Sequence, residues 1–171
     1  VSAYSVLIGE KLGLSDKDIH TLKIGGLFHD IGKIGVPDSI LLKSSKLSDD
    51  EYSQIKNHPS IGAHILGDVP MFQDIIPIVL HHHERFDGNG YPSQLKGSDI
   101  PYFARIAAVA DTFDAMTSKR SYRDSLPIDV VKDEIVRCSG TQFDPDIAKV
   151  FLDILNNEYD KIEEIKNEFK G

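Results

Sequence analysis

The stretch PYFARIAAVADTFDAM, residues 101–116, predicts a long helix that opens at Pro101, since proline is favoured at helix starts. Its apolar side chains recur at intervals of three and four residues, the spacing of one helix face: Ile106, Val109, Phe113 and Met116. Asp111 and Asp114 lie one turn apart, on a face that they share with alanines. Small neighbours let another helix approach closely, so we expect both carboxylates to point inward. Two solvent-exposed carboxylates are the alternative.

Helical spacing of apolar residues continues along almost the whole chain, and no long alternating strand pattern appears. Ser15, Ser48 and Asp144 are expected helix N-caps, and Ser48 forms a capping box with Glu51. Residues 34–47 are predicted to form a connecting loop. Helices are expected at 1–13, 15–30, 48–55, 72–83, 127–138 and 157–169, with further helix starts at His58-Pro59 and Asp144-Pro145.

The chain has no internal repeat, low-complexity tract or linker, so we expect residues 1–171 to form one all-α domain with extra helices at its C-terminal end. The first helix has an apolar stripe but no cap before it, which indicates that the sequence begins inside that helix. No run approaches the roughly 18 apolar residues of a membrane-spanning helix. The single cysteine, Cys138, excludes an internal disulfide and fits a reducing compartment, so a cytoplasmic location is expected.

The charge balance narrows the choice of ligands. Nineteen Lys and Arg stand against 27 Asp and Glu, a net charge of −8. This acidity argues against binding to duplex nucleic acid or to an anionic membrane surface. A small anionic ligand remains compatible, because bound metal can supply local positive charge. Seven histidines, three of them consecutive at 81–83, are the unusual feature of the composition.

Two histidine pairs are candidate sites. His29-Asp30 is expected near the end of the second helix, with Lys33 on the same face if that helix continues; a surface pair at a helix end is the alternative. His82-His83 ends an apolar helix, where imidazoles are costly to bury unless they find partners such as a metal. Neighbouring helix residues point about 100° apart. These two histidines would therefore bind different metals or straddle a wide site.

Histidine and carboxylate ligands together suit Fe, Mn, Ni, Co or Zn. Several such ions can clamp a phosphoryl group and acidify a water molecule. Lys33, Arg120 and Arg123 could add positive charge, although the two arginines alone would indicate a solvated basic turn. The other histidines are expected to be core or surface residues: His20, His64 and His81.

Taken in order, these segments resemble the HD-GYP family of bacterial phosphodiesterases, a branch of the HD hydrolases. The matching stretches are HDIGK at 29–33, HP at 58–59, HHERFDGNGYP at 82–92, VADTFDAM at 109–116, RSYR at 120–123 and GTQFDP at 140–145. The resemblance covers nearly the whole chain. It implies an all-α HD-domain helical bundle with a GYP loop.

The resemblance also implies a centre of two or three divalent transition-metal ions, iron or manganese in characterised types. Carried over by position, the ligands are His29, Asp30, His58, His82, His83 and Asp111. Asp30, as the bridging ligand, and Lys33, as the phosphate-contacting lysine, are the implied catalytic residues. The implied substrate contacts are Lys33, Gly90, Tyr91, Pro92, Asp114, Arg120 and Arg123.

The implied reaction is hydrolysis of cyclic di-GMP to the linear dinucleotide pGpG, with further hydrolysis to GMP left open. Two alternatives are an HD phosphohydrolase acting on other nucleotides and a catalytically silent module that binds a cyclic dinucleotide or a protein. A mixed purine cyclic dinucleotide is a further possible substrate. Such domains usually follow an N-terminal sensor or receiver domain. Family members also carry another ligand histidine just before the position of Val1, in agreement with a first helix that is cut.

Overall fold

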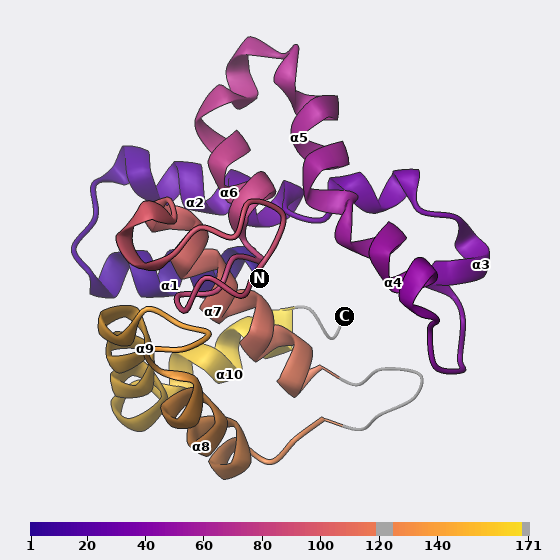
Figure 1. The fold of residues 1–171 in the computed structure, drawn as a ribbon. Helices are drawn as coiled ribbons and strands as arrows, with labels where there is room; N and C mark the ends of the chain where they lie inside the picture. Colours follow the sequence, from indigo (N-terminus) through magenta and orange to yellow (C-terminus); the bar gives the residue numbers. More distant parts are fainter. Residues whose placement is uncertain (119–124, 169–171) are drawn as a thin grey trace.

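The computed structural model describes residues 1–118 and 125–168, and within these ranges it consists of helices without β-strands (Figure 1). The α-helices are α1 (Ser2–Lys11), α2 (Asp16–Phe28), α3 (Asp38–Leu41), α4 (Asp49–Lys56), α5 (His58–Gly67), α6 (Ile76–His81), α7 (Tyr102–Thr117), α8 (Ile128–Cys138), α9 (Pro145–Asn157) and α10 (Tyr159–Glu168). Short 3-10 helices are η1 (Ile31–Gly35), η2 (Pro70–Ile75) and η3 (Gly97–Asp99). The predicted all-α class is confirmed. No described helix has both the length and the apolar character needed to cross a membrane.

Helix α7 runs through the middle of the main core, between α1 and α2 on one side and α8 to α10 on the other (Figure 1). All four residues of its predicted apolar face are buried. The ring of Phe113 meets Tyr4 of α1 and Phe151 of α9 edge-on, with centroids 4.9 and 5.0 Å apart. The predicted helix over residues 101–116 is therefore the one around which the others pack.

A smaller apolar cluster holds α5 and α6 together, and these two helices project from the rest of the molecule (Figure 1). Its buried members are Leu66, Ile75 and Val79. This packing brings the start of α5 and the end of α6 towards the end of α2. Three segments that are far apart in sequence thus present their termini to one region.

The predicted helix caps are confirmed. The Ser15 hydroxyl accepts a hydrogen bond from the Asp18 backbone N–H at 3.2 Å. Ser48 and Glu51 form the reciprocal capping box at the start of α4. Asp144 caps α9 by accepting from the Asp146 backbone N–H at 2.9 Å. Short side-chain oxygens satisfy backbone donors that no helix turn can reach, which is why these starts are readable from the sequence.

Two segments differ from the prediction. Residues 34–47, expected to be a loop, include the end of η1 and the short helix α3. The helix expected over 72–83 is divided, because residues 70–75 form η2 and the α-helix begins only at Ile76. Pro77 therefore lies in the first turn of α6 instead of interrupting a longer helix, and its missing N–H costs nothing there.

Candidate metal centre

The centre begins at the turn after α2. That helix ends at Phe28, and His29 and Asp30 lie on the turn that leads into η1. A Cβ at Gly32 would lie 1.8 Å from the carbonyl oxygen of His58, so only glycine lets the start of α5 pack against η1. This contact brings Nε2 of His58 to 3.2 Å from Oδ1 of Asp30.

Three histidines of the centre are anchored in the same way, because Nδ1 of each lies 2.7–2.9 Å from the carbonyl oxygen three residues earlier. The pairs are His29 with Gly26, His58 with Ile55, and His82 with Val79. A carbonyl oxygen only accepts, so Nδ1 carries the proton and donates it. Nε2 of each ring is therefore turned towards the other histidines and Asp30. Backbone anchors of this kind orient metal-binding histidines.

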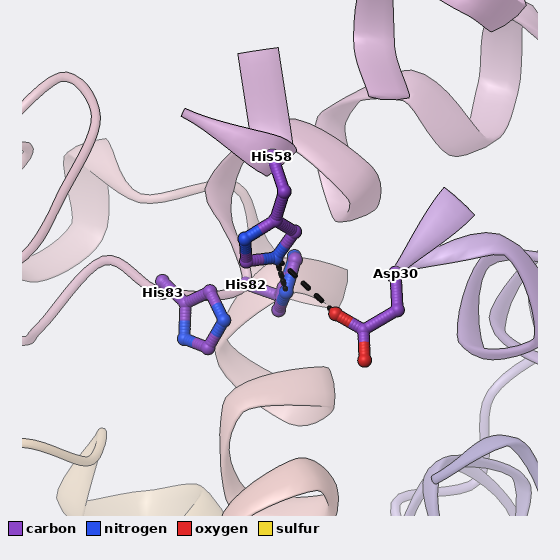
Figure 2. A group of neighbouring side chains, drawn as sticks. All are labelled: Asp30, His58, His82 and His83. Atoms are coloured by element: carbon purple, nitrogen blue, oxygen red, sulfur yellow. Dashed lines mark hydrogen bonds and ion pairs between the residues drawn. The ribbon is translucent and has the colours of Figure 1, made fainter. Parts of the chain in front are cut away.

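Asp30, His58, His82 and His83 form the tightest group, in which one ligand atom from each lies within 4.8 Å of the others (Figure 2). Nε2 of His58 is 3.4 Å from Nε2 of His82. Burial, with the neighbouring His83 and His29, lowers the pKa of His82 well below its usual value, so this ring is neutral. Its Nε2 then presents a buried lone pair that a cation can satisfy. Burial also lowers the pKa of His83 to about 4. This donor set fits a divalent transition metal.

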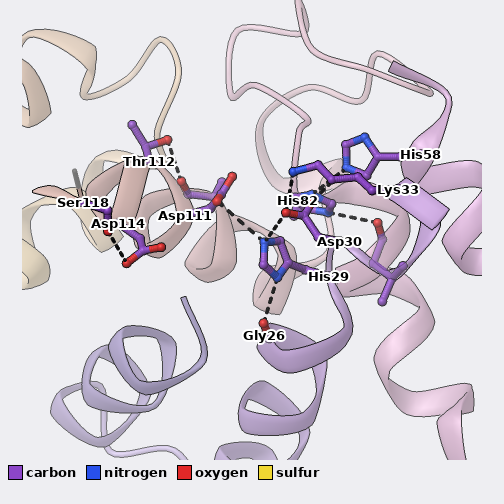
Figure 3. A network of polar contacts seen from close by, with 12 residues as sticks. Gly26, His29, Asp30, Lys33, His58, His82, Asp111, Thr112, Asp114 and Ser118 are labelled. Atoms are coloured by element: carbon purple, nitrogen blue, oxygen red, sulfur yellow. Dashed lines mark hydrogen bonds and ion pairs between the residues drawn. The ribbon is translucent and has the colours of Figure 1, made fainter. Parts of the chain in front are cut away.

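His29 links this group to α7 (Figure 3). Its Nε2 lies 3.3 Å from Oδ2 of Asp30 and 3.7 Å from Oδ1 of Asp111. Burial lowers the pKa of His29, but hydrogen bonds to these two carboxylates outweigh it and raise the pKa to about 9. Burial raises the pKa of Asp111, but His29 outweighs it and lowers that pKa to about 2. The structure therefore brings all six sequence-predicted ligands into one region.

Asp30 occupies the centre of this arrangement. Its Oδ1 faces His58, while its Oδ2 faces both His29 and Lys33. Burial alone would raise the pKa of Asp30, but hydrogen bonds from His29 and His58, followed by Lys33, hold it well below its usual value. The carboxylate is thus ionised, and each oxygen is directed towards a different histidine. That is the geometry expected of a ligand shared between two cations.

Lys33 lies beside the centre, but not on the helix face that the sequence predicted. A face shared with His29 required α2 to continue, but Lys33 lies in η1, beyond the end of that helix. Its Nζ lies 2.6 Å from Oδ2 of Asp30. The side chain is 41% exposed, so its ammonium remains accessible to a ligand while it touches the carboxylate.

The consecutive histidines also depart from helical geometry. α6 ends at His81, and His82 and His83 follow on a turn, with ring centroids 4.1 Å apart. Both rings therefore face one group, whereas a continued helix would have turned them apart. His81 lies outside the group, with Nδ1 3.6 Å from Oε1 of Glu84. The remaining two histidines, His20 and His64, are exposed elsewhere.

The loop that contains Gly90, Tyr91 and Pro92, called the GYP loop below, packs directly against the end of α6. A Cβ at Gly90 would come within 2.3 Å of the Arg85 backbone nitrogen, so glycine is required for this close contact. The ring of Tyr91 stacks on the His83 ring, with centroids 4.9 Å apart and planes 26° apart. Pro92 follows as an exposed residue. The loop thus covers one side of the histidine cluster with an aromatic ring.

Of the other predicted substrate contacts, Asp114 lies within the described part of the chain. Asp114 accepts a hydrogen bond from the Ser118 hydroxyl at 3.3 Å (Figure 3). It lines a cavity of about 840 Å³ whose wall also includes His29. Arg120 and Arg123 lie outside the described residues.

Glu84 is a positioning residue to which the sequence motif gave no role. Its side chain is fully buried, and its two oxygens accept hydrogen bonds from the backbone N–H groups of Ser93 and Leu95 at 2.7 and 3.1 Å. These bonds hold the segment that follows the GYP loop against the histidine turn. The available signal was a charged residue between histidines and a glycine-rich turn, since a buried carboxylate requires such partners.

The described residues form an all-helical fold that gathers histidine and aspartate side chains at several helix ends, in a group that could hold a metal ion. Residues 1–147 match the HD domain family. The chain is 42% identical over 148 residues to the cyclic di-GMP phosphodiesterase response regulator RpfG of Xanthomonas campestris, and 36% identical over 155 residues to the 3'3'-cGAMP-specific phosphodiesterase 2 of Vibrio cholerae. These alignments cover 85% and 90% of this chain.

The fold also matches a solved structure, an HDG"Y"P protein from Bdellovibrio bacteriovorus, with a TM-score of 0.71 and 23% identity. This match covers 91% of the chain and 52% of that protein. The chain belongs to the HD domain family. It spans 39% of the length of the Xanthomonas relative and 30% of the Vibrio relative.

Proposed function

We propose that the chain is the catalytic domain of a metal-dependent phosphodiesterase that hydrolyses cyclic di-GMP to linear pGpG, with GMP as a later product. The observation that carries this proposal is the convergence of Asp30, His58, His82 and His83 within 4.8 Å, beside a lysine that can reach a phosphate. Relatives named as phosphodiesterases of cyclic dinucleotides support the choice of substrate class.

In this proposal the six converging residues hold two or three divalent ions, iron or manganese. Bound ions supply Lewis acidity and neutralise phosphate charge. Asp30 would be the carboxylate shared between them, because its two oxygens face different histidines. The three backbone-anchored histidines hold their Nε2 atoms in place without further rearrangement, which reduces the cost of assembling the centre.

Lys33 binds a phosphate oxygen of the substrate in this scheme. Its ammonium is already within 2.6 Å of Asp30 and is partly exposed, so a phosphate at the centre gains a charge-assisted hydrogen bond. Gly90, Tyr91 and Pro92 line the nucleotide side, where Tyr91 covers His83. Asp114 contacts the substrate from the neighbouring cavity, and Arg120 and Arg123 supply further positive charge.

The substrate and the regulation are finer parts of the same proposal. We place cyclic di-GMP before 3'3'-cGAMP, and competition between the two for turnover decides the order. We also propose control by a sensor or receiver domain, since the Xanthomonas relative is named a response regulator and is longer than this chain. A cytoplasmic location stays a prediction.

The test is anaerobic purification, metal analysis and separation of the products formed from cyclic di-GMP. At least two transition-metal ions per chain and formation of pGpG are expected. Asp30→Ala should abolish both metal binding and turnover. Metal-free protein that still binds cyclic di-GMP undiminished would overturn the enzyme and favour a silent binding module. Turnover of other nucleotides in preference to cyclic dinucleotides would favour a general HD phosphohydrolase.

A further inference from the structure

A lysine and two tyrosines extend from the histidine cluster to the surface of α4. The Nζ of Lys56 lies 5.2 Å from the centroid of the Tyr52 ring and 5.9 Å from that of Tyr91. Tyr91 in turn stacks on His83, a member of the cluster. Lys56 is the last residue of α4 and stands two positions before His58. The ammonium of Lys56 therefore lies close to the centre without being part of it.

The ammonium of Lys56 has no carboxylate partner among the described residues, unlike the two lysines nearest to the centre and to α4 in the ion pairs that follow. Lys33 pairs with Asp30, and Lys43 pairs with Glu51. The described contacts of the Lys56 ammonium are with the two ring faces alone. In a chain of net charge −8, an unpaired cation beside a phosphate-binding centre is free to meet an anion.

Tyr52 offers the second element of a binding site. Its side chain belongs to α4, one turn before Lys56, and the residue is 49% exposed. An exposed aromatic ring is a stacking surface for a nucleobase, and every purine has a face that can use it. Lys56 lies over one face of the ring, so the aromatic platform and the cation are presented together.

A cyclic dinucleotide has features that the metal centre alone leaves unmatched. It carries two phosphodiesters and two bases, whereas a hydrolytic centre acts on one phosphodiester at a time. Lys33 and the proposed ions would bind the phosphate that is cleaved. The second phosphate and one base then lie away from the ions and need a cation and an aromatic surface.

We propose that Lys56 and Tyr52 form a distal subsite, in which Lys56 binds the phosphate that is not being cleaved and Tyr52 stacks on a purine base. This inference rests on the proposed phosphodiesterase function and deepens it. The subsite distinguishes a cyclic dinucleotide from a simple phosphodiester. A lysine that only stabilised the C-terminal end of α4 would make no such distinction.

The test compares cyclic di-GMP with bis(p-nitrophenyl) phosphate, which has one phosphodiester and neither a second phosphate nor a purine. Lys56→Gln should raise KM for cyclic di-GMP about tenfold, the loss of about one charge-assisted hydrogen bond. Its kcat, its metal content and both kinetic constants for the small substrate should stay within twofold of the wild type. Lys56→Arg should restore most of the affinity. Lys17→Gln removes the same charge from an exposed position on α2 and should change neither substrate's KM.

Tyr52 is tested by the same pair of substrates. Tyr52→Leu should raise KM for cyclic di-GMP several-fold, whereas Tyr52→Phe should keep wild-type values because the stacking face remains. Equal effects of Lys56→Gln on both substrates, or no effect on cyclic di-GMP, would overturn the subsite. A wild-type chain that is inactive on both substrates would instead overturn the proposed function, so the two failures are distinguishable.

Discussion

The turn after α2 and the start of α9 each place an aspartate beside a cation, yet the two regions differ in what the carboxylate meets. Asp144 is 6% exposed and accepts from Nη1 of Arg105 at 2.5 Å and from the backbone N–H of Asp146 at 2.9 Å. One partner ties α9 to α7 and the other caps α9. Asp30 is 35% exposed and meets histidine rings and Lys33, all turned to the same point.

This difference shows that an ion pair by itself does not identify a functional site. The partners of Asp144 belong to the helical framework, and each oxygen of the carboxylate accepts a hydrogen bond from one of them. The partners of Asp30 are side chains that can themselves bind a metal or a phosphate, and solvent still reaches the group. The identity of the partners and the remaining access therefore separate the two roles.

The largest expected effect is that of Asp30→Ala. Removing the shared carboxylate should lower both metal content and turnover of cyclic di-GMP by more than about 100-fold. Loss of a residue that only hydrogen-bonds to a metal ligand typically lowers them about 10- to 100-fold. Metal analysis and initial rates on the folded variant measure this. Asp74→Ala, which removes an exposed carboxylate on η2, is the matched control and should change neither value. Wild-type metal content in Asp30→Ala would contradict the metal-binding role that distinguishes Asp30 from Asp144.

Asp144→Ala should have the opposite profile. It leaves the partly buried Arg105 without its carboxylate and removes the cap of α9, so the free energy of unfolding should fall by about 3 kcal/mol. Denaturant titration measures the free energy of unfolding. Metal content per folded chain should stay at the wild-type value. A loss of metal with unchanged stability would show that Asp144 belongs with Asp30 after all.

Glu84→Gln tests a residue whose expected effect lies between those of Asp30→Ala and Asp144→Ala. The amide can accept only one of the two backbone hydrogen bonds, from Ser93 and Leu95, that the carboxylate accepts now. Losing one bond to a charged group costs about 1.5–3 kcal/mol and should loosen the GYP loop. KM for cyclic di-GMP should rise about tenfold, since 1.4 kcal/mol is a factor of ten, with metal content unchanged. An unaltered KM would mean that the loop needs no such support.

Ser48→Ala is the smallest change and concerns the framework alone. The capping box of α4 is exposed, and losing it should cost about 1 kcal/mol of stability. Thermal unfolding measures the shift, while turnover at a temperature well below the transition should equal that of the wild type. A large loss of activity would show that α4 depends on its cap to position Lys56.

The parts of the fold that the sequence predicted correctly are those set by local chemistry. The face of α7 and the caps at Ser15, Ser48 and Asp144 follow from spacing and from backbone donors that must be satisfied. The helix over 72–83 was wrong in extent, because tertiary packing selected a 3-10 turn before Pro77.

The candidate site was predictable in composition but not in geometry. The motif identified the six ligand candidates, while the arrangement of the histidines depends on where two helices end. α2 stops at Phe28 and α6 at His81, each two residues earlier than the sequence predicted. Those early ends turn His82 and His83 towards one group and leave Lys33 against Asp30. Glu84 received no role because its backbone partners lie nine and eleven residues further along the chain.

The most direct test of the central claim is anomalous diffraction from crystals of the protein loaded with manganese. One anomalous peak is expected between Asp30, His58, His82 and His83, and a second between Asp30, His29 and Asp111. Asp30 should contact both. Absence of any peak in this region, or a peak held by other residues, would contradict the account.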